Sequence, residues 1–249
     1  MRSVPSVPGY TGAMYRLLFA VSAAVVFAQD VPVRLQVDAT DAARRVFHVR
    51  MTIPAKPGAN TLLYPKWIPG EHMPSGPITN LVGLTVTAGG ATLPWTRDSE
   101  NMFAFHVTAP AGASTLDVVF DYIAPAEGGA FSAAASTTSA LAVINWNQLI
   151  LYPEGTEQSK LKMEASLKVP NGWRYGTALP IKSESGNEIQ FQPVSTETLV
   201  DSPISVGANY RTIELGEKHY LHVAADSMRA TEFPQDVLGR GIISRTIFC

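Results

Sequence analysis

The chain has 249 residues, of which 46% are hydrophobic and 16% charged, with a formal net charge of −2. This composition supports a packed core and excludes a mostly disordered chain, a strongly basic nucleic-acid-binding surface and electrostatic membrane attachment. The single cysteine, Cys249, excludes an internal disulfide, so stability has to come from burial of apolar surface.

Residues 1–28 are predicted to form an export signal. A start at Met14 would place Arg16 directly before a short apolar run that ends at Ala28. That run is about half the ~20 residues that a membrane-spanning helix needs, so cleavage after Ala28 is favoured over an anchor. We therefore expect an exported protein, periplasmic or secreted, with no stable membrane anchor after cleavage. A buried first strand is the alternative.

Alternation of apolar and polar residues dominates the next part of the chain and predicts β-strands. The predicted strands lie near residues 31–37, 47–53, 82–86, 93–95, 103–107, 116–122, 161–169 and 189–191. Gly89-Gly90 predicts a hairpin turn, and residues 124–140, which are mostly small, predict a mobile loop. Because short strands follow one another with turns between them, we predict an all-β protein, an antiparallel β-sandwich, over residues 29–212.

The last part of the chain, residues 213–249, differs in character. Strands are expected between Ile213 and Val223, and Asp226-Ser227 could open a helix. Residues 239–249 continue no expected element. We therefore predict a short mixed segment at the C-terminus, as in a truncated or frameshifted product.

No catalytic signature is present in the sequence. It contains no His-Glu-x-x-His, no Gly-x-Ser-x-Gly, no P-loop and no dinucleotide-binding glycine pattern. His219 and His222 are three residues apart, which on a strand places them on opposite faces and prevents them from sharing an ion. His48 and His106 are expected to be structural. We predict no catalytic residue and no metal ligand in this chain.

A stiff loop follows a predicted strand at residues 62–78. Four prolines fix φ, and Gly70 and Gly76 permit sharp reversals of the chain. Rigid loops on β scaffolds often carry binding contacts, and Trp67 is expected to reach a cleft. The predicted cleft loop consists of Tyr64, Trp67, Pro69, Gly70, Glu71 and His72.

The adjacent Glu71 and His72 could offer a carboxylate and an imidazole to a ligand. A structural or solvated role is favoured for both, and two neighbours are too few for a zinc site. The other tryptophans are expected to pack: Trp95 follows a hairpin, and Trp146 is expected in a strand.

Three segments resemble the N-terminal domain of the M61 glycyl aminopeptidase family. They are residues 64–72 with 76–78, residues 145–148 leading into 151–153, and residues 199–203. In that family a β domain precedes a thermolysin-like zinc catalytic domain. The resemblance extends roughly from Val31 to Asp226, and it implies that residues 213–249 begin a catalytic domain that is incomplete here.

The resemblance implies a non-catalytic β domain that flanks the cleft of a zinc aminopeptidase in full-length family members. For this chain alone we expect no peptidase activity and no cofactor. Zinc and a peptide substrate are expected only together with a catalytic domain, and no nucleic-acid partner is expected. Two alternatives stay open: a periplasmic β-sandwich module that binds carbohydrate or protein through exposed tryptophans, and a structural domain whose sheet edges accept partners.

Overall fold

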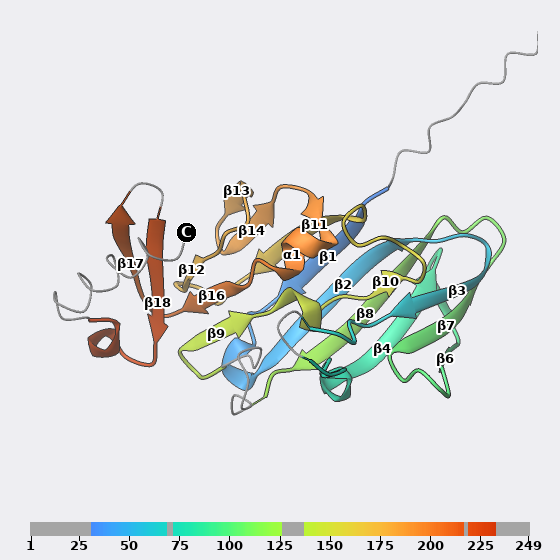
Figure 1. Cartoon of the computed structure of the whole chain (residues 1–249), viewed down its shortest axis with the longest axis horizontal. Helices are drawn as coiled ribbons and strands as arrows, with labels where there is room; N and C mark the ends of the chain where they lie inside the picture. Colours follow the sequence, from blue (N-terminus) through green and yellow to red (C-terminus); the bar gives the residue numbers. More distant parts are fainter. Residues whose placement is uncertain (1–30, 69–71, 126–136, 217–218, 233–249) are drawn as a thin grey trace, which may run out of the picture.

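The computed structural model describes residues 31–68, 72–125, 137–216 and 219–232 (Figure 1). Within these ranges the chain is mostly β, with a single short α-helix and several 3-10 helices. The predicted signal segment and most of the predicted mobile loop lie outside the described residues. In the described ranges, no helix combines the length and apolar character that crossing a membrane requires.

The largest sheet has nine strands, and their alternation in the sequence is what predicted most of them. The strand order is β13-β14-β11-β1-β2-β8-β4-β5, with β15 paired to β11. The bounds are β1 (Val33–Asp38), β2 (Val46–Pro54), β4 (Leu81–Ala88), β5 (Ala91–Leu93), β8 (Thr115–Ile123), β11 (Lys162–Lys168), β13 (Ile181–Ser185), β14 (Glu188–Phe191) and β15 (Val194–Ser195). The predicted hairpin is confirmed as β4–β5, with Gly89 and Gly90 both at positive φ.

The main sheet is mixed, so the prediction of a purely antiparallel arrangement is wrong. β1 pairs antiparallel with β2 but parallel with β11, with Leu35 opposite Ala165. A parallel pair needs a long crossover connection, and here most of the domain lies between the two strands. Alternation of apolar and polar residues reports which face a side chain occupies, not the direction of the neighbouring strand.

Three smaller sheets complete the fold. One has the order β10-β3-β7-β6, one the order β12-β16-β9, and one consists of β17 and β18. Their bounds are β3 (Gly58–Leu63), β6 (Trp95–Arg97), β7 (Ala104–Ala109), β9 (Leu141–Ile144), β10 (Tyr152–Pro153), β12 (Arg174–Gly176), β16 (Ile204–Gly207), β17 (Asn209–Gly216) and β18 (His219–Ala225). Figure 1 shows the β17–β18 hairpin at one end of the molecule and the β3–β7–β6 sheet at the other.

One face of the main sheet contributes to the core. Along β1, Val33, Leu35 and Val37 are buried, and the buried residues of β2, β8 and β11 lie beside them in register. The core also takes in residues of β3, β7, β9, β14 and β16, so the three larger sheets share one apolar interior. This shared interior is where burial stabilises the domain.

Short helices connect the sheets. They are η1 (Ala42–Arg44), η2 (Ile78–Asn80), η3 (Trp146–Gln148), α1 (Thr196–Val200) and η4 (Met228–Thr231). Trp146 is fully buried as expected, but it lies in η3 and not in a strand. The strands predicted between Ile213 and Val223 are confirmed as β17 and β18, and Ser227 caps η4 by accepting a hydrogen bond from the Ala230 N–H.

Candidate functional site

The loop that follows β3 begins with a buried anchor. Tyr64 is 1% exposed, and its hydroxyl donates a hydrogen bond of 3.1 Å to the main-chain carbonyl of Gln148. Burial raises the pKa of Tyr64, so the phenol stays protonated and able to donate. Three residues later, Trp67 is 62% exposed. The loop therefore has its first aromatic in the core and its second at the surface.

Gly76 holds the returning half of this loop against the first half. Its N–H donates to the Lys66 carbonyl at 3.1 Å. A Cβ atom at position 76 would lie 2.0 Å from the Pro65 carbonyl oxygen, closer than any real contact. The sequence therefore needs glycine here for close backbone approach.

Part of the predicted cleft loop is not described by the structure. Pro69, Gly70 and Glu71 lie outside the described residues. His72 is exposed on the far side of that gap. The predicted ligand contact through Glu71 and His72 therefore stays a prediction, while Tyr64 and Trp67 can be placed.

A hollow of about 510 Å³ lies beside Trp67. Its lining comes from three separated parts of the chain: the Trp67 loop, the stretch from η3 to β10, and α1. Its walls include Pro65, Lys66, Trp67, Asn147, Ile150, Tyr152, Gln158, Ser159, Thr196, Glu197, Val200 and Asp201. The three segments whose sequence resembles the M61 domain thus converge on one hollow, which we call the Trp67 hollow.

Two hydrogen bonds fix these segments to one another. The first is the Tyr64 contact to Gln148, which joins the loop to η3. The second runs from the indole Nε1 of Trp146 to the Ser202 carbonyl, at 3.0 Å, and joins η3 to the residue that follows α1. Both donors are buried, where an unmade hydrogen bond is costly. The geometry of the hollow is therefore set by the core.

The polar groups around the Trp67 hollow are unevenly satisfied. Asn147 is 5% exposed, and its side-chain Nδ2 has no hydrogen-bond partner in the described part of the chain. Glu197 and Asp201 are exposed, and neither carboxylate forms an ion pair or side-chain hydrogen bond within the described ranges. The Lys66 ammonium lies 5.7 Å from the centre of the Phe103 ring. The hollow thus offers one buried donor and a carboxylate-rich edge.

Nothing in the described ranges suggests a metal centre. No three histidine, cysteine, aspartate or glutamate side chains of those ranges cluster in a way that could hold an ion. His219 lies near the start of β18 and His222 near its middle, and the latter is beside Tyr210 at a ring separation of 6.0 Å.

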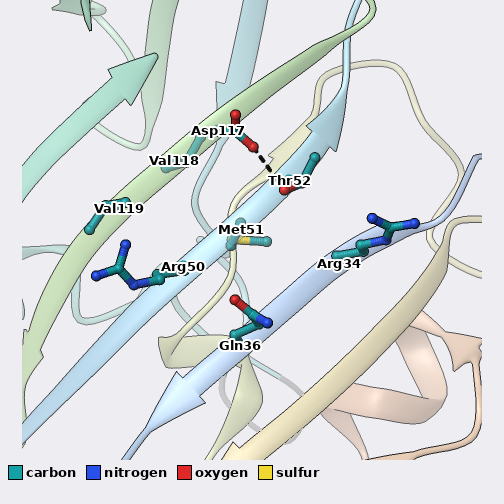
Figure 2. A pocket seen from close by; sticks show the side chains of 8 residues that line it. All are labelled: Arg34, Gln36, Arg50, Met51, Thr52, Asp117, Val118 and Val119. Carbon is teal, nitrogen blue, oxygen red and sulfur yellow. Dashed lines mark hydrogen bonds between the residues drawn. The ribbon is translucent and has the colours of Figure 1, made fainter. Parts of the chain in front are cut away.

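A second, shallower hollow lies on the outer face of the main sheet. It has about 350 Å³ and lies over β1, β2 and β8. Figure 2 shows its side chains, with Thr52 donating a hydrogen bond of 2.8 Å to Asp117. Arg34 pairs with Glu164 of β11 at 3.6 Å, whereas Arg50 has no ion pair among the described residues. These residues form a solvated polar face with little enclosure.

The same outer face carries an acid–imidazole–acid cluster that sequence reasoning missed. His48 contacts Asp121 through Nδ1 at 2.7 Å and Asp41 through Nε2 at 3.3 Å. The hydrogen bond to Asp121, supported by Asp41, raises the pKa of His48 although partial burial opposes it. Because His48 and Asp121 stand directly opposite each other on β2 and β8, the strand register would have revealed the pair.

Residues 34–208 match the peptidase M61 N-terminal domain. The chain belongs to this family. An aminopeptidase N family protein from Idiomarina loihiensis is similar to the chain, with 24% sequence identity and a TM-score of 0.62. Native leukotriene A4 hydrolase from Saccharomyces cerevisiae is a weaker likeness, with 13% identity over 77% of this chain and 31% of its own, and a TM-score of 0.46. No curated protein matches the chain.

The match to the Idiomarina protein covers 80% of this chain but only 34% of that protein. The M61 N-terminal domain thus spans about a third of the length of that relative. At this identity the likeness shows the fold. The expectation of an M61 N-terminal domain is confirmed, and the described residues show no catalytic domain.

Proposed function

We propose that this M61 N-terminal domain is a non-catalytic module that flanks and shapes the cleft of a zinc aminopeptidase catalytic domain. The observation that supports this is the convergence of the three M61-like segments on the Trp67 hollow. Short segments so far apart in sequence, two of them fixed to η3 by buried hydrogen bonds, make a preformed surface. Such a surface is suited to contact with a neighbouring domain or with a peptide lying between two domains.

Peptide hydrolysis is assigned to the partner domain and not to this chain. Zinc peptidases use a metal-activated water held by a three-ligand site. The sequence has no His-Glu-x-x-His, and we propose that zinc and substrate peptide bind only when a catalytic domain is present. We further propose that residues 213–249 begin that catalytic part, and that the large sheets pack as a sandwich around the shared core.

The test has two arms. The purified chain is incubated with zinc and a fluorogenic glycyl substrate, and no release is expected. The chain is then mixed with a separately produced M61 catalytic module, and complex formation is measured by size-exclusion chromatography with light scattering. Zinc-dependent glycine release by the chain alone, or failure of the wild-type chain to form any complex, would overturn the proposal.

Export is part of the proposal and depends on residues 14–28, which lie outside the described residues. Expression in a Gram-negative host with the native amino terminus should yield a periplasmic product that starts at Gln29. A cytoplasmic product that keeps Arg16 would contradict it.

A carbohydrate-binding role is the second candidate, and one observation favours it. Trp67 is the exposed member of the four tryptophans, and it borders a hollow large enough for a sugar. A glycan array probed with the wild-type chain and with Trp67→Ala tests this role. Binding that Trp67→Ala abolishes would support it, and an array without any bound glycan would discard it.

A further inference from the structure

We propose that the Trp67 hollow is a socket for a segment of the partner peptidase domain that presents an arginine side chain and a main-chain carbonyl. The inference rests on the proposed function, because it names the chemistry by which the partner domain docks. Three independent features of the hollow carry it: a buried donor, the charge at its edge, and its aromatic rim.

The buried donor is the side-chain amide of Asn147. A buried amide N–H without an acceptor costs on the order of 1–3 kcal/mol, so native proteins rarely leave one unpaired. Asn147 is 5% exposed, its Nδ2 has no partner among the described residues, and the residue lines the hollow. An acceptor brought by an occupant would satisfy this group. Main-chain carbonyls are the commonest acceptors that a polypeptide can bring.

The edge of the hollow favours a cation. Glu197 and Asp201 lie one helical turn apart, at the second residue and at the C-cap of α1, so their side chains are neighbours on one side of this helix. Both carboxylates are unpaired within the described ranges. The one cation of the lining, Lys66, has its ammonium 5.7 Å from the Phe103 ring centre. An incoming guanidinium could bond to both carboxylates at once, which a lysine ammonium does less well.

The rim and the size of the hollow fit a short segment. Trp67 is 62% exposed, and an aromatic face beside two carboxylates attracts a guanidinium by stacking. A volume of about 510 Å³ accommodates a few residues. Ile150 and Val200 supply the apolar wall against which an arginine stem would pack.

Capped tripeptides provide a direct probe on the isolated chain. Acetyl-Gly-Arg-Gly-amide is titrated into the ¹⁵N-labelled chain and followed by NMR, with the affinity measured by calorimetry. Acetyl-Gly-citrulline-Gly-amide has the same shape without the charge, and acetyl-Gly-Glu-Gly-amide reverses it. We expect the arginine peptide to shift the Asn147 side-chain amide and the Trp67 indole signals, and to bind at least fivefold more tightly than either control peptide.

Variants locate the binding. The double variant Glu197→Gln/Asp201→Asn is expected to weaken the arginine peptide at least fivefold, and Asn147→Leu is expected to weaken all three peptides while the fold is kept. Glu188→Gln is the matched control, because Glu188 is an exposed carboxylate on β14 outside this hollow. Circular dichroism melts of every variant verify folding.

Each other outcome overturns the inference. Equal binding of the arginine and citrulline peptides would exclude the carboxylate contact. Tight binding of Gly-Gly-Gly-amide with a free amino terminus, but not of the capped peptides, would assign the hollow to a substrate amino terminus. No binding of any peptide, or shifts confined to the outer face of the main sheet, would exclude a socket here.

The same variants separate this inference from the proposed function. If the wild-type chain and the three hollow variants form the complex with an M61 catalytic module equally well, the socket is excluded but the proposed function stands. If the wild-type chain forms no complex while the arginine peptide binds as expected, the proposed function fails instead.

Discussion

The indole Nε1 of Trp146 donates a 3.0 Å hydrogen bond to the main-chain carbonyl of Ser202, although the two residues are far apart in sequence. The ring itself is fully buried and meets Phe191 edge to face at 5.9 Å. This contact ties η3 to the end of α1, and so fixes two of the three walls of the Trp67 hollow.

Replacement of Trp146 should therefore destabilise the whole domain. Trp146→Ala leaves a large cavity and an unpaired Ser202 carbonyl, and we expect a loss of about 3–5 kcal/mol in the free energy of unfolding. Trp67→Ala removes an exposed ring and should change stability by less than about 0.5 kcal/mol. Urea denaturation followed by circular dichroism measures both values. Equal losses for the two variants would contradict the structural assignment.

A methyl group at position 76 should disturb the Trp67 loop. In Gly76→Ala the new Cβ would clash with the Pro65 carbonyl at 2.0 Å, so the backbone has to move, at a cost of about 1–3 kcal/mol. The emission maximum of Trp67 should shift along with the melting temperature. The control is Gly89→Asn, because that glycine has positive φ and open space around it, and asparagine tolerates this conformation. A stable Gly76→Ala protein with unchanged fluorescence would refute the close approach.

The His48 cluster should stabilise the protein at mildly acidic pH. Its folded-state pKa is raised above the unfolded value of about 6.5, so its contribution is fully present below that value and is lost as the pH rises through the folded-state pKa. His48→Gln should lower the melting temperature at pH 5.5 more than at pH 9. Because the pair is partly exposed, the difference corresponds to about 0.2–1 kcal/mol.

Asp121 provides the control for the His48 prediction. Asp121→Asn should remove most of the same pH-dependent stabilisation, and the double variant should lose little more than either single variant. Additive losses would show that Asp121 is not the main cause of the raised pKa. Asp41, the second acidic neighbour of His48, should have the smaller effect, because its contact is longer.

The turn that begins at Asp98 should weaken in strong acid. The backbone N–H of Asn101, then the His106 ring and the Glu100 N–H, hold the pKa of Asp98 at about 2. This depressed value means that Asp98 stabilises the fold above its unfolded pKa of about 3.8, and that the effect is lost as the pH falls through about 2. Asp98→Asn should melt at a lower temperature than wild type at pH 6, and the gap should close near pH 2. A gap independent of pH would contradict this reading.

Much of the secondary structure was predictable because one face of each main strand is buried. Val33, Leu35 and Val37 alternate with Arg34 and Gln36, and the structure buries only the first set. The segment around Trp146 was predicted less well. A fully buried tryptophan is compatible with a strand or with a 3-10 turn, and the flanking residues are buried in either case.

The candidate site was only partly predictable. Trp67 stood out because it lies in a stiff loop, but nothing local to that loop indicates that Asn147 or Asp201 would line the same hollow. Their meeting depends on contacts between distant segments, such as the one from Tyr64 to Gln148. The family resemblance marked all three segments without showing that they touch.

The parallel pairing of β1 with β11 has a consequence for how the protein is made. A ribosome delivers residues 33–38 early, but their neighbour on one side, residues 162–168, emerges only after most of the domain has been synthesised. Until then, one long edge of β1 presents unpaired backbone groups. Nascent chains that stall before β11 should therefore be the form that holdase chaperones capture, whereas chains released after Phe191 should escape them.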